Sequence, residues 1–266
     1  MANPNVDERG YIYGKFQTGP KTWTIMSRNA PQFVYLLIGD EKAALIDTFY
    51  GFGDLRQLVE TITDKPVMVI NTHGHFDHTG GNSFWPEAYM SEYATTEAKK
   101  AFGAEMEAMV QSHAYPDYEC KVLNDGDVIE LGNHTLEIIK IGAHNKGSIA
   151  ILDKTERILY GGDEIEAGQV LIAAANIPTH LETMLKLKSF EDQFDFINSA
   201  HNGTHLTKDY IDDFIELDKR FIAGTAEKLD STAGFGWADG PGGFNNAPQE
   251  RYNYGRAHFI VFKSFG

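Results

Sequence analysis

The chain has 266 residues and a formal net charge of −15, with 38 acidic side chains against 23 basic ones and 42% apolar residues. This length and apolar content support one large domain, or two small ones, with a sizeable core. The strong negative charge disfavours any role that depends on contacts to phosphate groups, so we expect no nucleic-acid partner.

The compartment is predicted from features that the sequence lacks. Cys120 is the single cysteine, so an intrachain disulfide is excluded, and we expect a partly buried structural thiol. Residues 1–8 have neither the basic n-region nor the apolar h-region of a signal peptide. No apolar stretch approaches the length of a membrane span. We therefore expect a cytoplasmic protein with no membrane partner, although a chain trimmed of its signal peptide would look the same.

Strands and helices are predicted in two batches along the chain. Residues 11–30 are expected to form an irregular or strand-forming arm. Strands at 33–38 and 43–46, a helix at 54–63, a buried strand at 67–70 and a helix at 92–111 follow. The second batch has strands at 128–131, 134–141, 149–152 and 158–160, then helices at 180–189 and 208–222. This order predicts an α/β fold of the αββα type, in which two mixed β-sheets pack face to face with helices outside.

The end of the chain has a different composition. Residues 224–243 are rich in Gly, Ala, Asp and aromatic side chains, and an apolar run at 259–262 predicts a terminal strand. We expect a single domain covering residues 1–266, with 224–266 as a long loop and that strand. The aromatic residues of this region form either an apolar lid over a functional site or part of an edge strand on the core. They are Trp237, Phe244, Tyr252 and Tyr254.

The most informative segment is residues 72–78, which read Thr-His-Gly-His-Phe-Asp-His. It places His73, His75, Asp77 and His78 directly after the buried strand at 67–70. A strand that ends in His-x-His-x-Asp-His delivers several metal ligands from one short loop. Imidazole and carboxylate together suit zinc, iron or manganese. The alternative interpretation is a polar strand-to-helix turn with solvated histidines.

This segment resembles the signature of the metallo-β-lactamase-fold hydrolases. The Gly-Gly-Asn at 80–82 is most similar to the glyoxalase II (hydroxyacylglutathione hydrolase) branch, and the resemblance runs from about Val34 to about Phe221. It implies three further ligands: His144 in Gly-Ala-His-Asn-Lys-Gly-Ser, Asp163 at the end of an apolar strand, and His201 in Ser-Ala-His-Asn-Gly. Asn and Lys after His144 replace the Thr-Pro that relatives usually have there.

Each further ligand has an alternative. His144 could be a surface loop histidine and Asp163 a turn aspartate, with Glu164 as the substitute bridging carboxylate. The rivals of His201 are His205 and His180, of which the latter is expected to cap a helix. Three more histidines have no partner pattern and are expected to be structural or exposed: His113, His134 and His258.

The resemblance implies two half-sites for two Zn²⁺, with Mn²⁺ or Fe²⁺ also open. One half-site consists of His73, His75 and His144, and the other of Asp77, His78 and His201, with Asp163 bridging both. Asp47, in an Ile-Asp-Thr turn, is expected to orient the metal loop through hydrogen bonds. No cysteine replaces a ligand, which argues against one β-lactamase subclass. His75 stands where the flavo-diiron relatives usually carry Glu, which disfavours that branch.

The function implied by the resemblance is that of a binuclear metal-dependent hydrolase. A metal-bridging hydroxide would cleave a small ester, lactone or thioester, with Asp77 as a metal ligand that also shuttles a proton. The expected partner is this small-molecule substrate, and a homo-oligomer stays open. No Gly-x-Ser-x-Gly elbow competes. The alternatives are a mononuclear iron enzyme like the persulfide dioxygenases, a phosphodiesterase, a β-lactamase, and a non-enzymatic binding protein.

Overall fold

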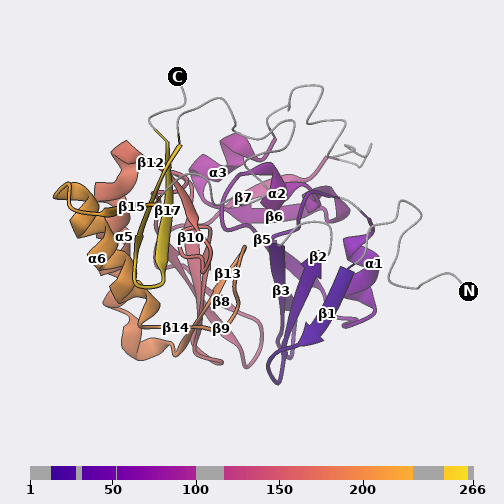
Figure 1. Cartoon of the computed structure of the whole chain (residues 1–266). Coiled ribbons are helices and arrows are strands. Elements are labelled where there is room, and N and C mark those ends of the chain that lie inside the picture. The colour runs from indigo at the N-terminus through magenta and orange to yellow at the C-terminus, as the bar shows by residue number, and fades with distance from the viewer. Residues whose placement is uncertain (1–12, 28–31, 52, 100–116, 230–248, 263–266) are drawn as a thin grey trace, which may run out of the picture.

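Two β-sheets lie face to face in the middle of the molecule, with helices on their outer sides (Figure 1). The computed structural model describes residues 13–27, 32–51, 53–99, 117–229 and 249–262. The αββα sandwich predicted from the sequence is confirmed. None of the helices in these ranges is long and apolar enough to cross a membrane.

The first sheet has seven strands within the described ranges, in the order β1 to β7. Strands β1 to β4 pair antiparallel, and β4 to β7 pair parallel, so the carboxyl ends of β4 and β5 lie at the same edge. The strands are β1 (Tyr13–Gln17), β2 (Thr22–Ser27), β3 (Gln32–Ile38), β4 (Ala43–Ile46), β5 (Val67–Ile70), β6 (Glu87–Met90) and β7 (Glu119–Val122).

Short helices follow the strands of the first sheet. Helix α1 (Leu55–Glu60) begins after Asp54, whose carboxylate accepts a hydrogen bond from the Gln57 N–H, and α3 (Glu92–Glu97) begins after Ser91, which caps it in the same way. Between them lie α2 (Phe76–Thr79) and the 3-10 turn η1 (Asn82–Phe84). The helix predicted over 92–111 is described as α3 only to Glu97, and residues 100–111 of the prediction lie outside the described ranges.

The second sheet has the order β14-β13-β11-β10-β9-β8 in the described chain. Strand β13 runs parallel to β11, so both point their carboxyl ends at the same edge. Two long helices belong to this half of the chain, α5 (Ile177–Lys188) before β13 and α6 (Tyr210–Ile222) after β14. Two 3-10 turns, η2 (Ala174–Asn176) and η3 (Glu191–Gln193), flank α5. The strands are β8 (Val128–Glu130), β9 (Thr135–Lys140), β10 (Ile149–Asp153), β11 (Ile158–Gly162), β13 (Phe196–Ser199) and β14 (Leu206–Thr207).

Alternating side chains build separate layers of core on the two faces of each sheet. In β3, Tyr35 faces the second sheet, where its ring packs against Tyr160 with centroids 4.9 Å apart. Leu36 faces the other way and packs in the cluster that contains Leu55 of α1. The outer face of the second sheet is covered by α5 and α6 in a third cluster.

A third, four-stranded sheet was not predicted apart from its terminal strand. Its order is β12 (Val170–Ala173), β17 (Ala257–Phe262), β16 (Gln249–Tyr254) and β15 (Glu227–Leu229). The Tyr252 ring packs edge-on against Phe221, with centroids 4.9 Å apart, and Arg220 lies 4.1 Å from the centre of the Tyr254 ring. These two tyrosines therefore pack on the core as strand residues. Trp237 and Phe244, the other aromatics considered for a lid, lie outside the described residues.

Candidate metal centre

The predicted ligands all lie at the carboxyl ends of strands or in the loops that follow them. The loop after β5 and the short helix α2 carry the first four, the β9–β10 loop carries the fifth, and the segments after β11 and β13 carry the last two. Because β4/β5 and β11/β13 are parallel pairs, these ends meet at one edge of the sandwich. All seven side chains come together there: His73, His75, Asp77, His78, His144, Asp163 and His201.

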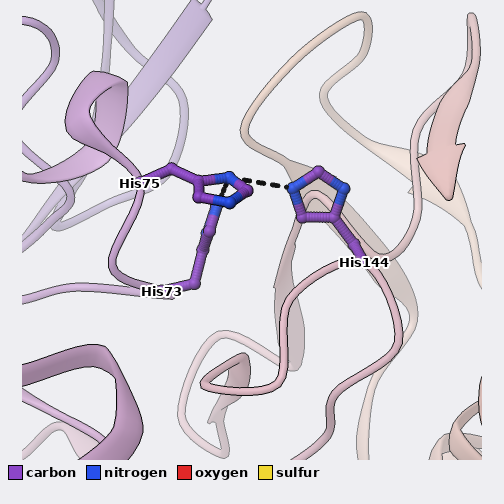
Figure 2. A group of neighbouring side chains, drawn as sticks. All are labelled: His73, His75 and His144. Atoms are coloured by element: carbon purple, nitrogen blue, oxygen red, sulfur yellow. Dashed lines mark hydrogen bonds between the residues drawn. The ribbon is translucent and has the colours of Figure 1, made fainter. Parts of the chain in front are cut away.

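Three imidazoles form the first half-site (Figure 2). His75 Nδ1 lies 2.9 Å from His73 Nε2 and 3.2 Å from His144 Nε2. In a tetrahedral zinc site with metal–nitrogen distances of about 2.0–2.1 Å, neighbouring ligand nitrogens are separated by about 3.3 Å. The three nitrogens therefore converge at the spacing that one common cation requires.

The second half-site combines two imidazoles with a carboxylate. Asp77 Oδ2 lies 3.4 Å from His78 Nε2 and 3.2 Å from His201 Nε2. Asp163 stands between the two half-sites: its Oδ2 atom lies 3.4 Å from His78 Nε2, 3.7 Å from His201 Nε2 and 3.6 Å from His144 Nε2. One carboxylate oxygen thus faces imidazoles of both groups.

The donor atoms fit divalent cations. Within the described residues, His78 Nε2 and Asp163 Oδ1 are buried without a hydrogen-bond partner, which is costly unless another group satisfies them. Burial lowers the pKa of His201, but Asp163 and Asp77 outweigh it and raise that pKa to about 10. The same carboxylates outweigh burial at His78 and raise its pKa as well. The carboxylates therefore draw positive charge to this place, which a metal ion would also supply.

The first half-site has the opposite electrostatic character. Burial, followed by neighbouring imidazoles, lowers the pKa of His73 well below its usual value. Burial, and then His144, lowers the pKa of His75 to about 4. These rings are neutral at physiological pH, and a neutral imidazole is the form that binds a metal.

Asp47 supports the metal loop as expected. Its carboxylate accepts hydrogen bonds of 2.8 Å from the backbone N–H of Thr72, from the Thr72 hydroxyl and from His78 Nδ1. The residue is buried and has a φ of 64°, a left-handed conformation that Asp and Asn tolerate better than most residues. One side chain thus fixes both the start of the loop and the ring of a predicted ligand.

Gly74 and Gly80 leave no room for a Cβ atom, because neighbouring segments lie against them. A Cβ on Gly74 would lie 2.7 Å from Glu97 Cβ and 2.8 Å from the Ala94 oxygen, so α3 packs directly on the backbone between the first two ligands. A Cβ on Gly80 would lie 2.3 Å from the carbonyl carbon of Tyr50. Any larger residue would push the loop away from its supports.

The Glu164 alternative is wrong in geometry. Its carboxylate points away from the metal ligands and accepts hydrogen bonds from the backbone N–H groups of Ala143 (2.9 Å) and His144 (3.1 Å). His180 does not cap a helix. It lies inside α5, fully buried, with Nδ1 2.9 Å from Asp218 Oδ2 and Nε2 3.0 Å from the Glu164 carbonyl oxygen. The Glu164 side chain therefore holds the backbone at His144, and the His180 side chain holds the backbone next to Asp163.

The other histidines lie apart from the seven predicted ligands. His134 is buried, with Nε2 2.5 Å from Asp153 Oδ2, and has a structural role. His205 contacts Asn198, and His258 lies half-buried in β17. His113 lies outside the described residues.

Two further groups beside the centre were not predicted from the sequence. Glu166 is buried, accepts a hydrogen bond of 3.0 Å from the Asn202 amide, and has its pKa raised to about 8 by burial and by Asp163. The Tyr50 phenol is buried and its pKa is raised, by burial and then by the charges of Asp77 and Asp163. The acidic run 163–166 could have drawn attention to Glu166, whereas no sequence pattern marks Tyr50.

The two-sheet scaffold and the cluster of histidine and aspartate side chains at its edge belong to one known superfamily. The family model described as the metallo-beta-lactamase superfamily matches residues 28–206, and the chain belongs to that superfamily. The chain is 28% identical to the human protein named acyl-coenzyme A thioesterase MBLAC2 over 168 residues, which cover 52% of this chain and 60% of the relative. The hydroxyacylglutathione hydrolase GloC of Haemophilus influenzae is 23% identical over 142 residues, covering 51% of this chain and 67% of that protein.

Solved structures show the same fold. The metallo-beta-lactamase from Pontibacter korlensis superposes with a TM-score of 0.58 at 17% identity, covering 78% of this chain and 99% of that one. The chain spans about 60% of the length of the human relative. These findings confirm the superfamily and the glyoxalase II-like branch that the sequence motifs predict.

Proposed function

We propose that this chain is a binuclear metal-dependent hydrolase that cleaves a small thioester, ester or lactone. The observation that carries the proposal is the position of Asp163. Its Oδ2 atom lies 3.4–3.9 Å from the Nε2 atoms of His73, His78, His144 and His201, so one carboxylate faces both half-sites. That arrangement fits two cations held side by side, with three imidazoles on one and Asp77, His78 and His201 on the other.

Two bound cations would supply a hydroxide at neutral pH and polarise the carbonyl of the substrate. The chain's own residues orient the ligands for this chemistry. Asp47 fixes the ring of His78, the Leu171 carbonyl oxygen accepts a hydrogen bond from His144 Nδ1 at 2.7 Å, and Glu164 holds the backbone of the His144 loop. These supports keep the ligand set in place without the reacting groups having to reorganise.

Asp77 is the proposed proton carrier. Its carboxylate faces His78 and His201, and its side chain is 15% exposed, against 8% for Asp163 and 0% for His78. Burial raises the pKa of Asp77, but the neighbouring His78 and His201 outweigh it and lower the pKa well below its usual value. Asp77 is thus ionised and lies at the more exposed edge of the centre, where a group that passes a proton to solvent would have to lie.

A thioester is the substrate to test first. The human relative is named a thioesterase for acyl-coenzyme A, and the Haemophilus influenzae relative is named for an acylglutathione, which is also a thioester. The proposed partner is therefore a small molecule. Zinc is the proposed metal because imidazole and carboxylate ligands in this arrangement suit it, and Mn²⁺ or Fe²⁺ would use the same ligands.

The test is release of free thiol from a short acyl thioester by the zinc-loaded protein. We expect turnover by the native chain and none by His73→Ala or Asp77→Ala, because each removes a ligand. His205→Ala is the matched control, since this histidine lies outside the ligand set, and it should retain native turnover. Full turnover by His73→Ala or Asp77→Ala would contradict the proposal.

A further inference from the structure

In two of the predicted ligands, His144 and His78, the ring nitrogen that points away from the metal centre has a hydrogen-bond acceptor. His144 Nδ1 donates to the carbonyl oxygen of Leu171 at 2.7 Å, and His78 Nδ1 donates to Asp47 at 2.8 Å. An imidazole that binds a cation through one nitrogen carries its proton on the other, so an acceptor at that second nitrogen favours binding.

His75 differs from these two ligands. Its Nδ1 atom faces His73 and His144 in the cluster (Figure 2), so its Nε2 atom is the one that points away. Nε2 lies 3.1 Å from Nδ2 of Asn145. An amide nitrogen donates hydrogen bonds and has no lone pair with which to accept one.

Two other contacts fix the orientation of the Asn145 amide. Its Oδ1 accepts a hydrogen bond of 2.6 Å from the Gly147 N–H, and its Nδ2 donates to Glu97 Oε2 at 2.7 Å. Turning the amide over would set its oxygen against the Glu97 carboxylate and its NH₂ group against the Gly147 N–H. The amide nitrogen is therefore held facing His75, in a side chain that is buried.

Helix α3 holds this arrangement in place. Glu97 is its last residue, and Ser91, which caps its start, donates from Oγ to the Gly147 carbonyl oxygen at 2.5 Å. The helix also packs directly on Gly74, between the first two ligands. Glu97 and Asn145 thus form a fixed pair next to His75.

We propose that the Glu97–Asn145 pair weakens cation binding at the half-site of His73, His75 and His144. Facing an amide donor, Nε2 of His75 is the unprotonated nitrogen in the metal-free chain, and Nδ1 carries the proton. A cation at Nδ1 moves that proton to Nε2, where it meets the Asn145 NH₂ group instead of an acceptor. His78 already has Asp47 as its acceptor and faces no such conflict.

This inference rests on the proposed function, because it concerns metal binding at the same centre. Its test reverses the polarity of the pair with Glu97→Gln and Asn145→Asp together. The carboxylate introduced at position 145 can accept from the Gly147 N–H, from the amide introduced at position 97 and from His75 Nε2–H, so each contact keeps a donor and an acceptor. Zinc affinity is measured by competition with a chromophoric chelator in a His201→Ala background, which disables the second half-site.

We expect the reversed pair to bind zinc at least about 10-fold more tightly than the His201→Ala parent, the lower end of the usual effect of such supporting groups. Glu97→Gln alone is the matched control. It removes the carboxylate without giving His75 an acceptor, so it should not tighten binding. An affinity for the reversed pair equal to or weaker than the parent's would overturn the inference.

A second measurement reads the proton of His75 in the native chain. In ¹⁵N spectra of the metal-free protein, with the signals of His75 assigned from a His75→Gln variant, the proton should reside on Nδ1. A proton on Nε2 would overturn the inference. If native protein binds two zinc ions and hydrolyses thioesters while the reversed pair is no tighter, only this inference fails. If the native protein binds no zinc at micromolar concentrations, both this inference and the proposed function fail.

Discussion

Replacing Asp47 by Asn tests how far one buried carboxylate supports the metal centre. Asp47 accepts hydrogen bonds from the Thr72 N–H, the Thr72 hydroxyl and His78 Nδ1, and it is 1% exposed. Asn has nearly the same volume and tolerates the left-handed backbone at this position, so the substitution changes charge and polarity alone. One acceptor oxygen becomes an NH₂ group, and the amide can no longer satisfy all three donors.

The expected magnitude follows from those contacts. A hydrogen bond to a charged group contributes about 1.5–3 kcal/mol, and the two bonds that remain weaken toward about 1 kcal/mol each when the charge is removed. We expect Asp47→Asn to lower the free energy of unfolding of the metal-free protein by about 2–3 kcal/mol. Loss of a group that orients a metal-binding histidine typically weakens metal affinity by about 10–100-fold.

The assay is urea unfolding of the metal-free protein, together with zinc titration against a chelator. Asp40→Asn is the matched control, because Asp40 is exposed and pairs with Lys21 on the surface. Exposed pairs contribute about 0–1 kcal/mol, so this control should differ little from native. If Asp47→Asn unfolds at the native urea concentration and binds zinc with native affinity, the role assigned to Asp47 is wrong.

Three further predictions concern the supports and protons of the centre. Glu164→Gln should lower the free energy of unfolding by about 1–3 kcal/mol, because one amide oxygen replaces the carboxylate that holds the backbone N–H of His144; an unchanged urea midpoint would contradict this. Gly74→Ala should cost about 1–3 kcal/mol, since its Cβ overlaps α3, and native thermal stability would refute that overlap. Carboxylates outweigh burial and raise the pKa of His201 to about 10 and that of His78 as well. Zinc should therefore displace at least the His201 proton at about pH 7.5 and bind more weakly as pH falls, which calorimetry in buffers of different ionisation enthalpy measures. Binding without proton release would show that these rings are already neutral.

Local patterns were enough to predict the strands that flank the centre. The runs at 43–46 and 67–70 form β4 and β5 with the predicted bounds, and Gly132 and Asn133 turn between β8 and β9 with φ values of 77° and 57°. The sequence could mark the proposed ligands because each follows a strand whose end the motif marks. Their convergence depends on parallel pairing, which the motif spacing alone does not specify.

The unpredicted features depend on tertiary contacts. Strands β12 and β15 are short, and β12 pairs with β17, which lies far along the chain, so no local pattern reveals their sheet. The prediction that His180 caps a helix was wrong, because its hydrogen-bond partner, Asp218, lies on another helix. We propose that residues 1–266 form one domain, because the third sheet shares a hydrophobic cluster with α5, α6 and the second sheet. The role of 224–266 as a lid stays a prediction.

The metal content of the protein distinguishes a binuclear hydrolase from a mononuclear iron enzyme. Elemental mass spectrometry on protein purified without added metal gives the number and identity of ions per chain. We expect about two ions of zinc or manganese per chain, held by the two half-sites. A single iron per chain, with oxygen consumed in the presence of a persulfide, would contradict the binuclear hydrolase and favour a mononuclear oxygenase.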